Sequence, residues 1–184
     1  MSLQTWRETL MTMKASGPTL TAAAAASMLE TRAPFTVPPN FFEAGKKLYI
    51  RAAGRISCVV TTPGTARFDV RLGGIVVFDT AALNLNVVAK VTVPWSLEVD
   101  LTCYAAGTGT LANIMGVANF QSEAVVGSPL SSAGSNGALL APVGAPTVGA
   151  GFNSTASQLL DMFFTQTVAT GSFTCHQYEL IACN

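Results

Sequence analysis

The sequence predicts an all-β protein, an antiparallel β-sandwich, from three observations. Apolar and polar side chains alternate with the period of two that is typical of half-buried strands, in one segment after another from residue 35 onward. Turn signals rich in glycine and proline separate these segments, and no convincing long helix lies between them. We therefore expect seven or eight strands in about 150 residues, a number typical of a two-sheet sandwich.

The composition predicts a surface that other protein covers. The 184 residues make one domain, or one domain with an arm, and a chain of this size buries roughly 70% of its unfolded surface. Charged residues are 11% of the chain, where about 25% is usual, and ten Lys and Arg balance ten Asp and Glu. Because a neutral, charge-poor surface tends to associate, we expect a homo-oligomer, most simply a trimer.

The same numbers argue against several classes of partner. Net neutrality is unlike the basic footprint of a nucleic-acid-binding protein or of a polybasic membrane anchor. No run of about 18 apolar residues is present, so we expect no transmembrane helix. Glu8 and Pro18 interrupt the apolar N-terminal pattern, so a secretory signal is not expected either.

Residues 1–33 are predicted to form an N-terminal arm, extended and partly helical, in front of a sandwich domain at 34–184. One or two helical turns are expected over Trp6–Met13, before the break at Gly17-Pro18. Because the arm is apolar, we expect it to lie along a neighbouring subunit or a shell. The predicted partner-binding residues are Trp6, Leu10, Met13, Leu20 and Leu29.

The first strands of the sandwich are predicted from alternation and turn chemistry. A strand is expected around residues 48–53, where Leu48, Ile50 and Ala52 share one face. A hairpin is expected over residues 67–78, because Gly73-Gly74 provides the two-residue turn that needs positive φ.

The later strands follow the same logic. Five alternations in a row over Trp95–Cys103 give the strongest strand signal in the chain, and further strands are expected over 111–124, 159–168 and 173–183. A segment rich in Gly, Ser, Ala and Pro lies at 124–157. Because long unstructured loops are unusual in compact domains, we expect it to be an excursion from one end of the sandwich or a crossing to a neighbour.

The candidate catalytic residues are few. Glu98 and Asp100 lie on one side of a strand about 7 Å apart, which suits paired-carboxylate glycoside hydrolysis. They are better interpreted as an outward polar face opposite Arg67 or Arg71. His176, the single histidine, is interpreted as a surface or interface residue rather than a general base.

The sequence predicts no catalytic, cofactor or metal site. No nucleophile-elbow, phosphate-loop or metalloprotease motif is present. A calcium site using Asp69, Asp79 or Asp100 stays open, although no EF-hand spacing supports it. Asn153 begins a glycosylation sequon, a pattern frequent by chance.

Cysteines and aromatic residues are predicted to serve packing. The wide spacing of the four cysteines, without a CxxC pair, predicts free thiols, and Cys103 shares the apolar face of Trp95. The cysteines are Cys58, Cys103, Cys175 and Cys183, and the aromatic residues expected in the core are Phe68, Trp95, Phe120, Phe163 and Phe173.

Four segments carry a resemblance to virion structural proteins of tailed bacteriophages. They read NFFEAGKKLYIRAAGRIS from Asn40, TTPGTARFDVRLGGIVVF, VPWSLEVDLTCYAAGTGTLANIMGVANF and FNSTASQLLDMFFTQTVA. The resemblance covers roughly residues 18–184, and its motifs are structural. The four cysteines and the Gly/Ser segment at 127–151 depart from the pattern.

The resemblance implies a jelly-roll-like sandwich that assembles in a virion, formed in the host cytoplasm, and no enzymatic residue. The expected function is that of a capsid decoration (cement) protein bound to the major capsid protein. Two alternatives stay open: a tail, fibre or spike component that binds a host glycan, and a carbohydrate-active enzyme using Glu98 and Asp100.

Overall fold

The protein is a two-layer antiparallel β-sandwich. The computed structural model describes residues 6–58, 64–125, 138–169 and 171–183, and all regular structure in these ranges is β. The strands are β1 (Arg7–Thr12), β2 (Ala26–Ser27), β3 (Phe35–Val37), β4 (Lys47–Cys58), β5 (Thr65–Leu72), β6 (Ile75–Asp79), β7 (Leu83–Asn84), β8 (Lys90–Ala105), β9 (Asn113–Ser122), β10 (Ala138–Ala141), β11 (Gln158–Gln166) and β12 (Ser172–Cys183).

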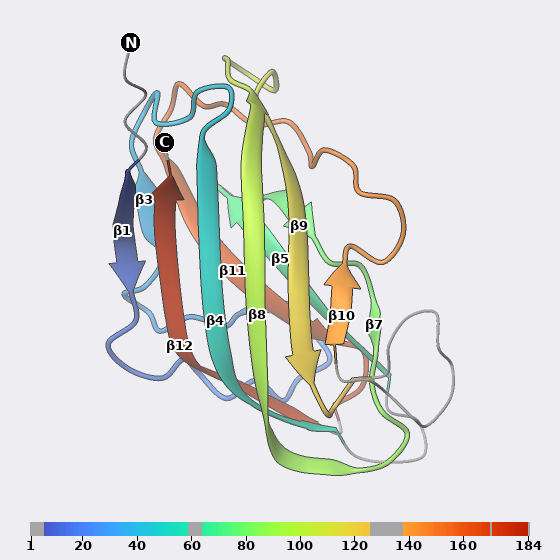
Figure 1. The fold of residues 1–184 in the computed structure, drawn as a ribbon. Helices are drawn as coiled ribbons and strands as arrows, with labels where there is room; N and C mark the ends of the chain where they lie inside the picture. Colours follow the sequence, from blue (N-terminus) through green and yellow to red (C-terminus); the bar gives the residue numbers. More distant parts are fainter. Residues whose placement is uncertain (1–5, 59–63, 126–137, 170, 184) are drawn as a thin grey trace.

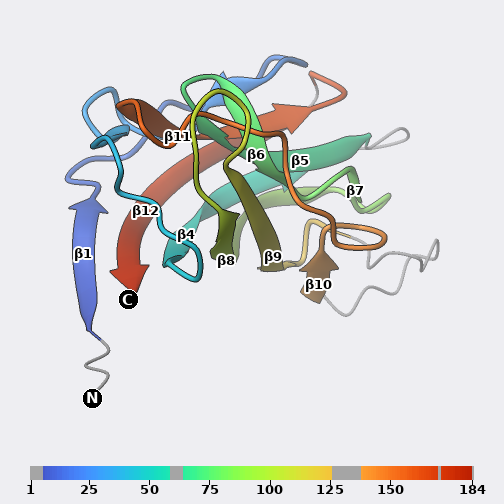
Figure 2. The ribbon, with the colours of Figure 1, turned by 90° about the horizontal axis from the view of Figure 1, so that it is seen from above.

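The strands form two sheets that stack on each other (Figures 1 and 2). Sheet A has the strand order β1-β12-β4-β8-β9-β10, and sheet B has the order β2-β11-β5-β6. In sheet B, β3 also pairs with β11, and β7 pairs with β5. Every pairing is antiparallel, so the predicted all-β sandwich is confirmed.

Alternation places the inward side chains as the sequence predicts. In β8, Trp95, Leu97, Val99, Leu101 and Cys103 are all buried, and the residues between them face outward. The hairpin at Gly73-Gly74 is also confirmed. Both glycines have positive φ, 56° and 87°, which is the geometry of the tight turn that joins β5 to β6.

The N-terminal segment differs from the prediction. Residues 7–12 form strand β1 rather than helical turns, and β1 pairs along the C-terminal half of β12 at the edge of sheet A. The physical reason is that β12 offers a free row of backbone donors and acceptors at this edge, which an irregular arm would leave unpaired. The alternation is weak here because β1 lies at the surface and is shifted in register between Thr9 and Met11.

Several residues between 20 and 33 pack onto their own chain. Leu20 forms a bridge with Phe173, and Met28 and Leu29 are buried in the core. Short strand β2 pairs with β11 through Ser27. Met28 and Leu29 are therefore covered within the chain, whereas Trp6 stays exposed.

The described part of the Gly/Ser-rich excursion, residues 138–157, packs closely on the sandwich. Strand β10 extends sheet A beyond β9. The chain then returns along the sandwich, with bridges from Val148 to Met115 and from Phe152 to Ala112. Phe152 is fully buried and stacks edge-on against Phe42, so one aromatic side chain holds this segment against the core.

An aromatic cluster joins the two sheets. Phe68 of β5 and Phe164 of β11 come from sheet B and pack against side chains from sheet A. The closest stack is between Phe164 and Phe173, with ring centroids 3.9 Å apart. The sheet A members are Trp95, Phe120 and Phe173.

Phe163 is not a core residue, which corrects the prediction. It lies on the outer face of β11, where the guanidinium of Arg71 sits 3.8 Å from its ring centroid. The core position belongs to the next residue, Phe164. Two consecutive phenylalanines on one strand must face opposite sides, and the sequence pattern alone did not distinguish them.

A glycine makes room for the tryptophan of this cluster. Gly54 lies beside Trp95 and Cys175 in the sheet, and a Cβ added to it would lie 2.0 Å from the backbone oxygen of Thr174. The same oxygen accepts a hydrogen bond from Trp95 Nε1 at 3.3 Å. Any side chain at position 54 would therefore push β12 away from β4.

We predict opposite outcomes for the two neighbouring phenylalanines. Phe164→Ala should lower the free energy of unfolding by about 3–5 kcal/mol, because it empties a packed position between the sheets. Phe163→Ala should cost only about 1–2 kcal/mol, the size of a cation–π contact on a half-buried ring. Urea unfolding of both variants measures this, and equal losses would contradict the strand register.

Candidate functional site

The outer face of sheet A carries a polar zone over β12, β4 and β8. The antiparallel register arranges its side chains in rows that cross the strands. One row contains small side chains between two amides, in the order Gln177, Ala53, Ser96 and Gln121. The next row is charged, in the order Glu179, Arg51, Glu98, then Asn119.

The two candidate carboxylates face outward and are both paired. Glu98 Oε1 lies 3.5 Å from Arg51 Nε, and Asp100 Oδ2 lies 3.1 Å from Lys47 Nζ. Their partners are residues of β4, the neighbouring strand, not Arg67 or Arg71 as predicted. The interpretation as an outward polar face is confirmed, and the identity of the opposing cations is corrected.

Arg67 and Arg71 belong to the other sheet. Arg67 pairs with Asp79, and Arg71 pairs with Asp69. Asp69 and Asp79 are direct cross-strand neighbours on β5 and β6, whereas Asp100 lies on sheet A. The three carboxylates considered for calcium are therefore not brought together.

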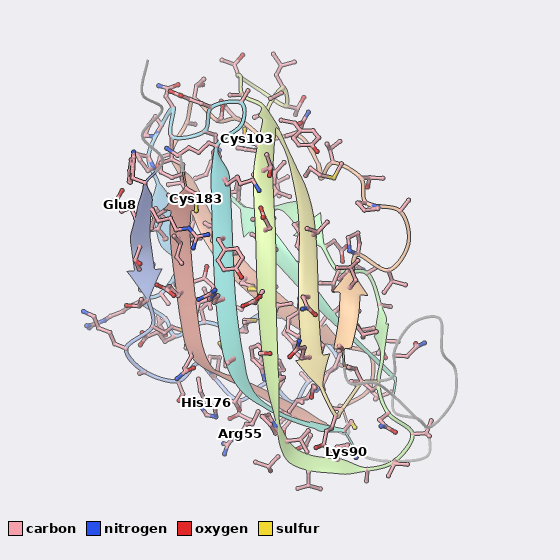
Figure 3. The ribbon with its side chains drawn as sticks, in the orientation of Figure 1. Glu8, Arg55, Lys90, Cys103, His176 and Cys183 are labelled. Atoms are coloured by element: carbon pink, nitrogen blue, oxygen red, sulfur yellow. The ribbon has the colours of Figure 1, made fainter. Side chains whose placement is uncertain are left out.

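His176 lies at a β-bulge in β12. The register shifts between Cys175 and Gln177, so His176 and Gln177 are consecutive and both exposed. The Oγ of Ser16 lies 2.8 Å from His176 Nδ1, which leaves Nε2 on the far side of the ring. Figure 3 shows His176 toward the lower end of sheet A.

A hollow of about 560 Å³ lies between the bulge and the charged row. Its floor is the row of small side chains, Ala53 and Ser96, together with strand backbone whose own side chains point inward. Its polar margins come from both sides of this floor. They are Thr12, Arg51, Glu98, His176, Gln177 and Glu179.

The other part of this outer face, over β9 and β10, carries no charge and exposes aliphatic side chains beside the amides Asn119 and Gln121. Neither β9 nor β10 contains an ionisable residue. Leu140 is 78% exposed, Val117 is 40% exposed and Val148 is 44% exposed. We call these three residues with Met115 the apolar face, because pairing places all four beside or on β9.

Charge is unevenly distributed along the chain. All ten lysines and arginines lie at or before Lys90, and residues 124–160 contain no charged side chain. Folding keeps this division, because β4 and β5 carry most of the paired cations while β9 and β10 carry none. The outer face of sheet A is therefore charged over β12, β4 and β8 and uncharged over β9 and β10, where aliphatic side chains lie beside amides.

The predicted partner-binding residues of the arm differ in exposure and divide into three groups. Trp6 is 47% exposed, directly before β1 at the sheet edge. Leu29 is buried, so it is not available to a partner. The remaining three, Leu10, Met13 and Leu20, are partly buried against the core.

The four cysteines are free thiols with different exposure. Cys58, Cys103 and Cys175 are buried, and Cys183 is half-buried near the C-terminal end of β12. Burial raises the pKa of Cys175 to about 12, and burial also raises the pKa of Cys103. Both thiols are therefore protonated at neutral pH, as inert packing groups are.

Within the described ranges, no three His, Cys, Asp or Glu side chains gather in a way that could hold a metal ion. The same ranges contain no helix long and apolar enough to cross a membrane. Comparison with protein families, curated proteins and solved structures found no match.

Sequence reasoning missed the hollow and the apolar face. The hollow needs the bulge at His176, because only the bulge turns two consecutive side chains outward. The apolar face had a signal, since the longest uncharged stretch of the sequence contains β10 and Val148. What the sequence did not specify is that Ala138–Ala141 of this stretch pair with β9 and so extend sheet A.

We predict that one thiol per chain reacts under native conditions. At mildly alkaline pH, a disulfide reagent should label Cys183 rapidly, whereas the three buried thiols should react only on unfolding. Cys183→Ser should remove the fast phase, and mass spectrometry of the labelled protein identifies the site. Fast labelling of Cys103, or a disulfide between Cys103 and Cys58, would contradict the face assignment of β8.

Proposed function

We propose that the protein is a non-enzymatic virion structural subunit of a tailed bacteriophage, of the capsid decoration type. In this proposal, copies of the chain associate through the apolar face as a homo-oligomer, most simply a trimer. The oligomer binds the major capsid protein on the outside of the shell. The observation that carries the proposal is an uncharged sheet face with exposed aliphatic side chains, on a chain with few charges overall.

The pairing of strands supports a jelly roll, the finer description of the fold. The pairs β1 with β12, β2 with β11, β4 with β8 and β5 with β6 are those of one long hairpin rolled into two sheets. The two sheets then have the orders β1-β12-β4-β8 and β2-β11-β5-β6, with β9 and β10 added to the first. Jelly rolls are common in viral capsid and lectin domains.

The apolar face supports assembly because leaving it in water is unfavourable. Each square ångström of apolar surface removed from water contributes about 25 cal/mol. The face needs no charge to be desolvated on association, since β9 and β10 have no ionisable residues. A second copy of this face, packed against the first, removes aliphatic surface from water and desolvates no charge.

Decoration stabilises a shell by mass action. A subunit that binds only the assembled, expanded shell stabilises it by several kcal/mol per site when its concentration is far above Kd. No reaction is required, so Arg51 and Glu98 form a solvent-exposed ion pair rather than an acid–base pair. Trp6 is the proposed anchor on the shell, because it is exposed beside the edge strand β1.

We predict an oligomer whose mass depends on the apolar face. Light scattering after size-exclusion chromatography should give a multiple of 19.1 kDa for the wild-type chain. Leu140→Lys should shift the mass to that of the monomer, because it places a charge at the most exposed residue of the apolar face. Leu159→Lys, at an exposed leucine of sheet B, is the matched control and should leave the oligomer intact.

The proposal also predicts location and copy number. Quantitative mass spectrometry of gradient-purified particles of the phage that encodes this chain should find it at hundreds of copies per particle. Tens of copies or fewer would place it in the tail, and absence from particles would contradict a virion role.

Anchoring through Trp6 has its own test. Trp6→Ala should keep the oligomer mass but weaken binding to shells lacking the protein by more than about tenfold, the loss expected for an aromatic anchor worth about 2 kcal/mol. Sedimentation of the variant with such shells measures this. Unchanged binding would mean that the shell contact lies elsewhere.

A further inference from the structure

We propose that the hollow on the outer face of sheet A binds a neutral, hydroxyl-rich ligand, an oligosaccharide. The proposal is independent of the assembly role, because the hollow over β12, β4 and β8 is separate from the apolar face over β9 and β10. Three features carry it: the shape of the hollow, its mixture of donors and acceptors, and its balance of charge.

The shape suits a short saccharide chain. A volume of about 560 Å³ lies within the range of about 300–1,000 Å³ found for small-molecule sites. The floor is low because Ala53 and Ser96 are the two small side chains of one row. Gln177 flanks them on one side. The hollow opens to solvent along the sheet, so a ligand longer than one sugar ring can extend beyond it.

The polar groups match hydroxyls better than any one charged ligand. Carboxylates only accept hydrogen bonds, guanidinium only donates them, and glutamine and serine do both. Sugar hydroxyls donate and accept, so a hydroxyl can donate to Glu98, accept from Arg51, or form a hydrogen bond of either kind with Gln177. His176 offers one more polar group. Ser16 Oγ lies 2.8 Å from Nδ1 and fixes the ring, so Nε2 stays free to contact a ligand.

The charge balance disfavours ions. Arg51 lies between Glu98 and Glu179 in one row, so a phosphate or sulfate beside the guanidinium would also meet a carboxylate. A cationic ligand beside either carboxylate would meet Arg51. Glu179 is further occupied by a hydrogen bond from Thr9 Oγ1 at 3.0 Å. A neutral ligand avoids both conflicts.

The bulge in β12 indicates that this geometry is specified rather than incidental. Regular pairing would turn either His176 or Gln177 into the core, and the extra residue places both on the outer face. Buried Cys175 and Tyr178 on either side keep the strand anchored. The bulge therefore places two polar side chains at the edge of the hollow.

The test is binding of defined sugars by the full chain. The probes are an array of neutral gluco-, galacto- and manno-oligosaccharides with acidic sialylated and sulfated sugars beside them, followed by calorimetric titration of the best neutral binder. We expect saturable binding of at least one neutral oligosaccharide. Binding of none, or of acidic sugars alone, would overturn the proposal.

Variants locate the site. Ser96→Trp fills the hollow, and Arg51→Ala removes the guanidinium donor at its margin. Each variant should weaken binding by at least about tenfold. Lys47→Ala is the matched control, because Lys47 is an equally exposed, ion-paired cation on β4 outside the hollow. Equal binding by wild type and both hollow variants, with their folding checked by thermal unfolding, would overturn the proposal. The oligomer mass of the same variants is expected to be unchanged, which separates this result from the assembly proposal.

Discussion

The packing of Phe68 and Phe164 of sheet B against Trp95 and Phe173 of sheet A is the constraint on which the rest of the fold depends. It sets the spacing of the sheets and fixes the register of β11 against β5. It also requires glycine at position 54, because only a residue without a side chain lets β12 pass close to Trp95. With the sheets held there, the outward rows of β12, β4 and β8 follow from the pleat.

Much of this fold could be predicted from alternation. The face of β8 from Trp95 to Cys103 and the hairpin at Gly73-Gly74 follow from period two and from positive φ, both local properties. Strand β1 could not be predicted in this way, since its conformation comes from pairing with β12, which is distant in sequence. Sequence alternation placed Glu98 and Asp100 of β8 on the outer face, where they lie. Their cationic partners depend on which strand lies beside β8, which alternation does not give.

The outer face of sheet A separates two kinds of surface on one scaffold. Over β4 and β8, charges are matched in pairs, and small residues leave a hollow beside them. Over β9 and β10, charge is absent and aliphatic side chains are exposed. A charge-poor composition thus does not mean a uniform surface. On this sheet the charged side chains lie over β12, β4 and β8, and the uncharged strands β9 and β10 form the edge proposed to meet another subunit.

The most direct test of the proposed assembly is a cryo-electron microscopy map of the protein on its particle. We expect the sandwich to appear in oligomers on the outside of the shell, with Leu140, Val117 and Val148 covered by a second copy and the hollow beside His176 open to solvent. A map in which β9 and β10 face solvent in every copy, or in which the sandwich stands alone without a neighbouring copy, would contradict assembly through the apolar face.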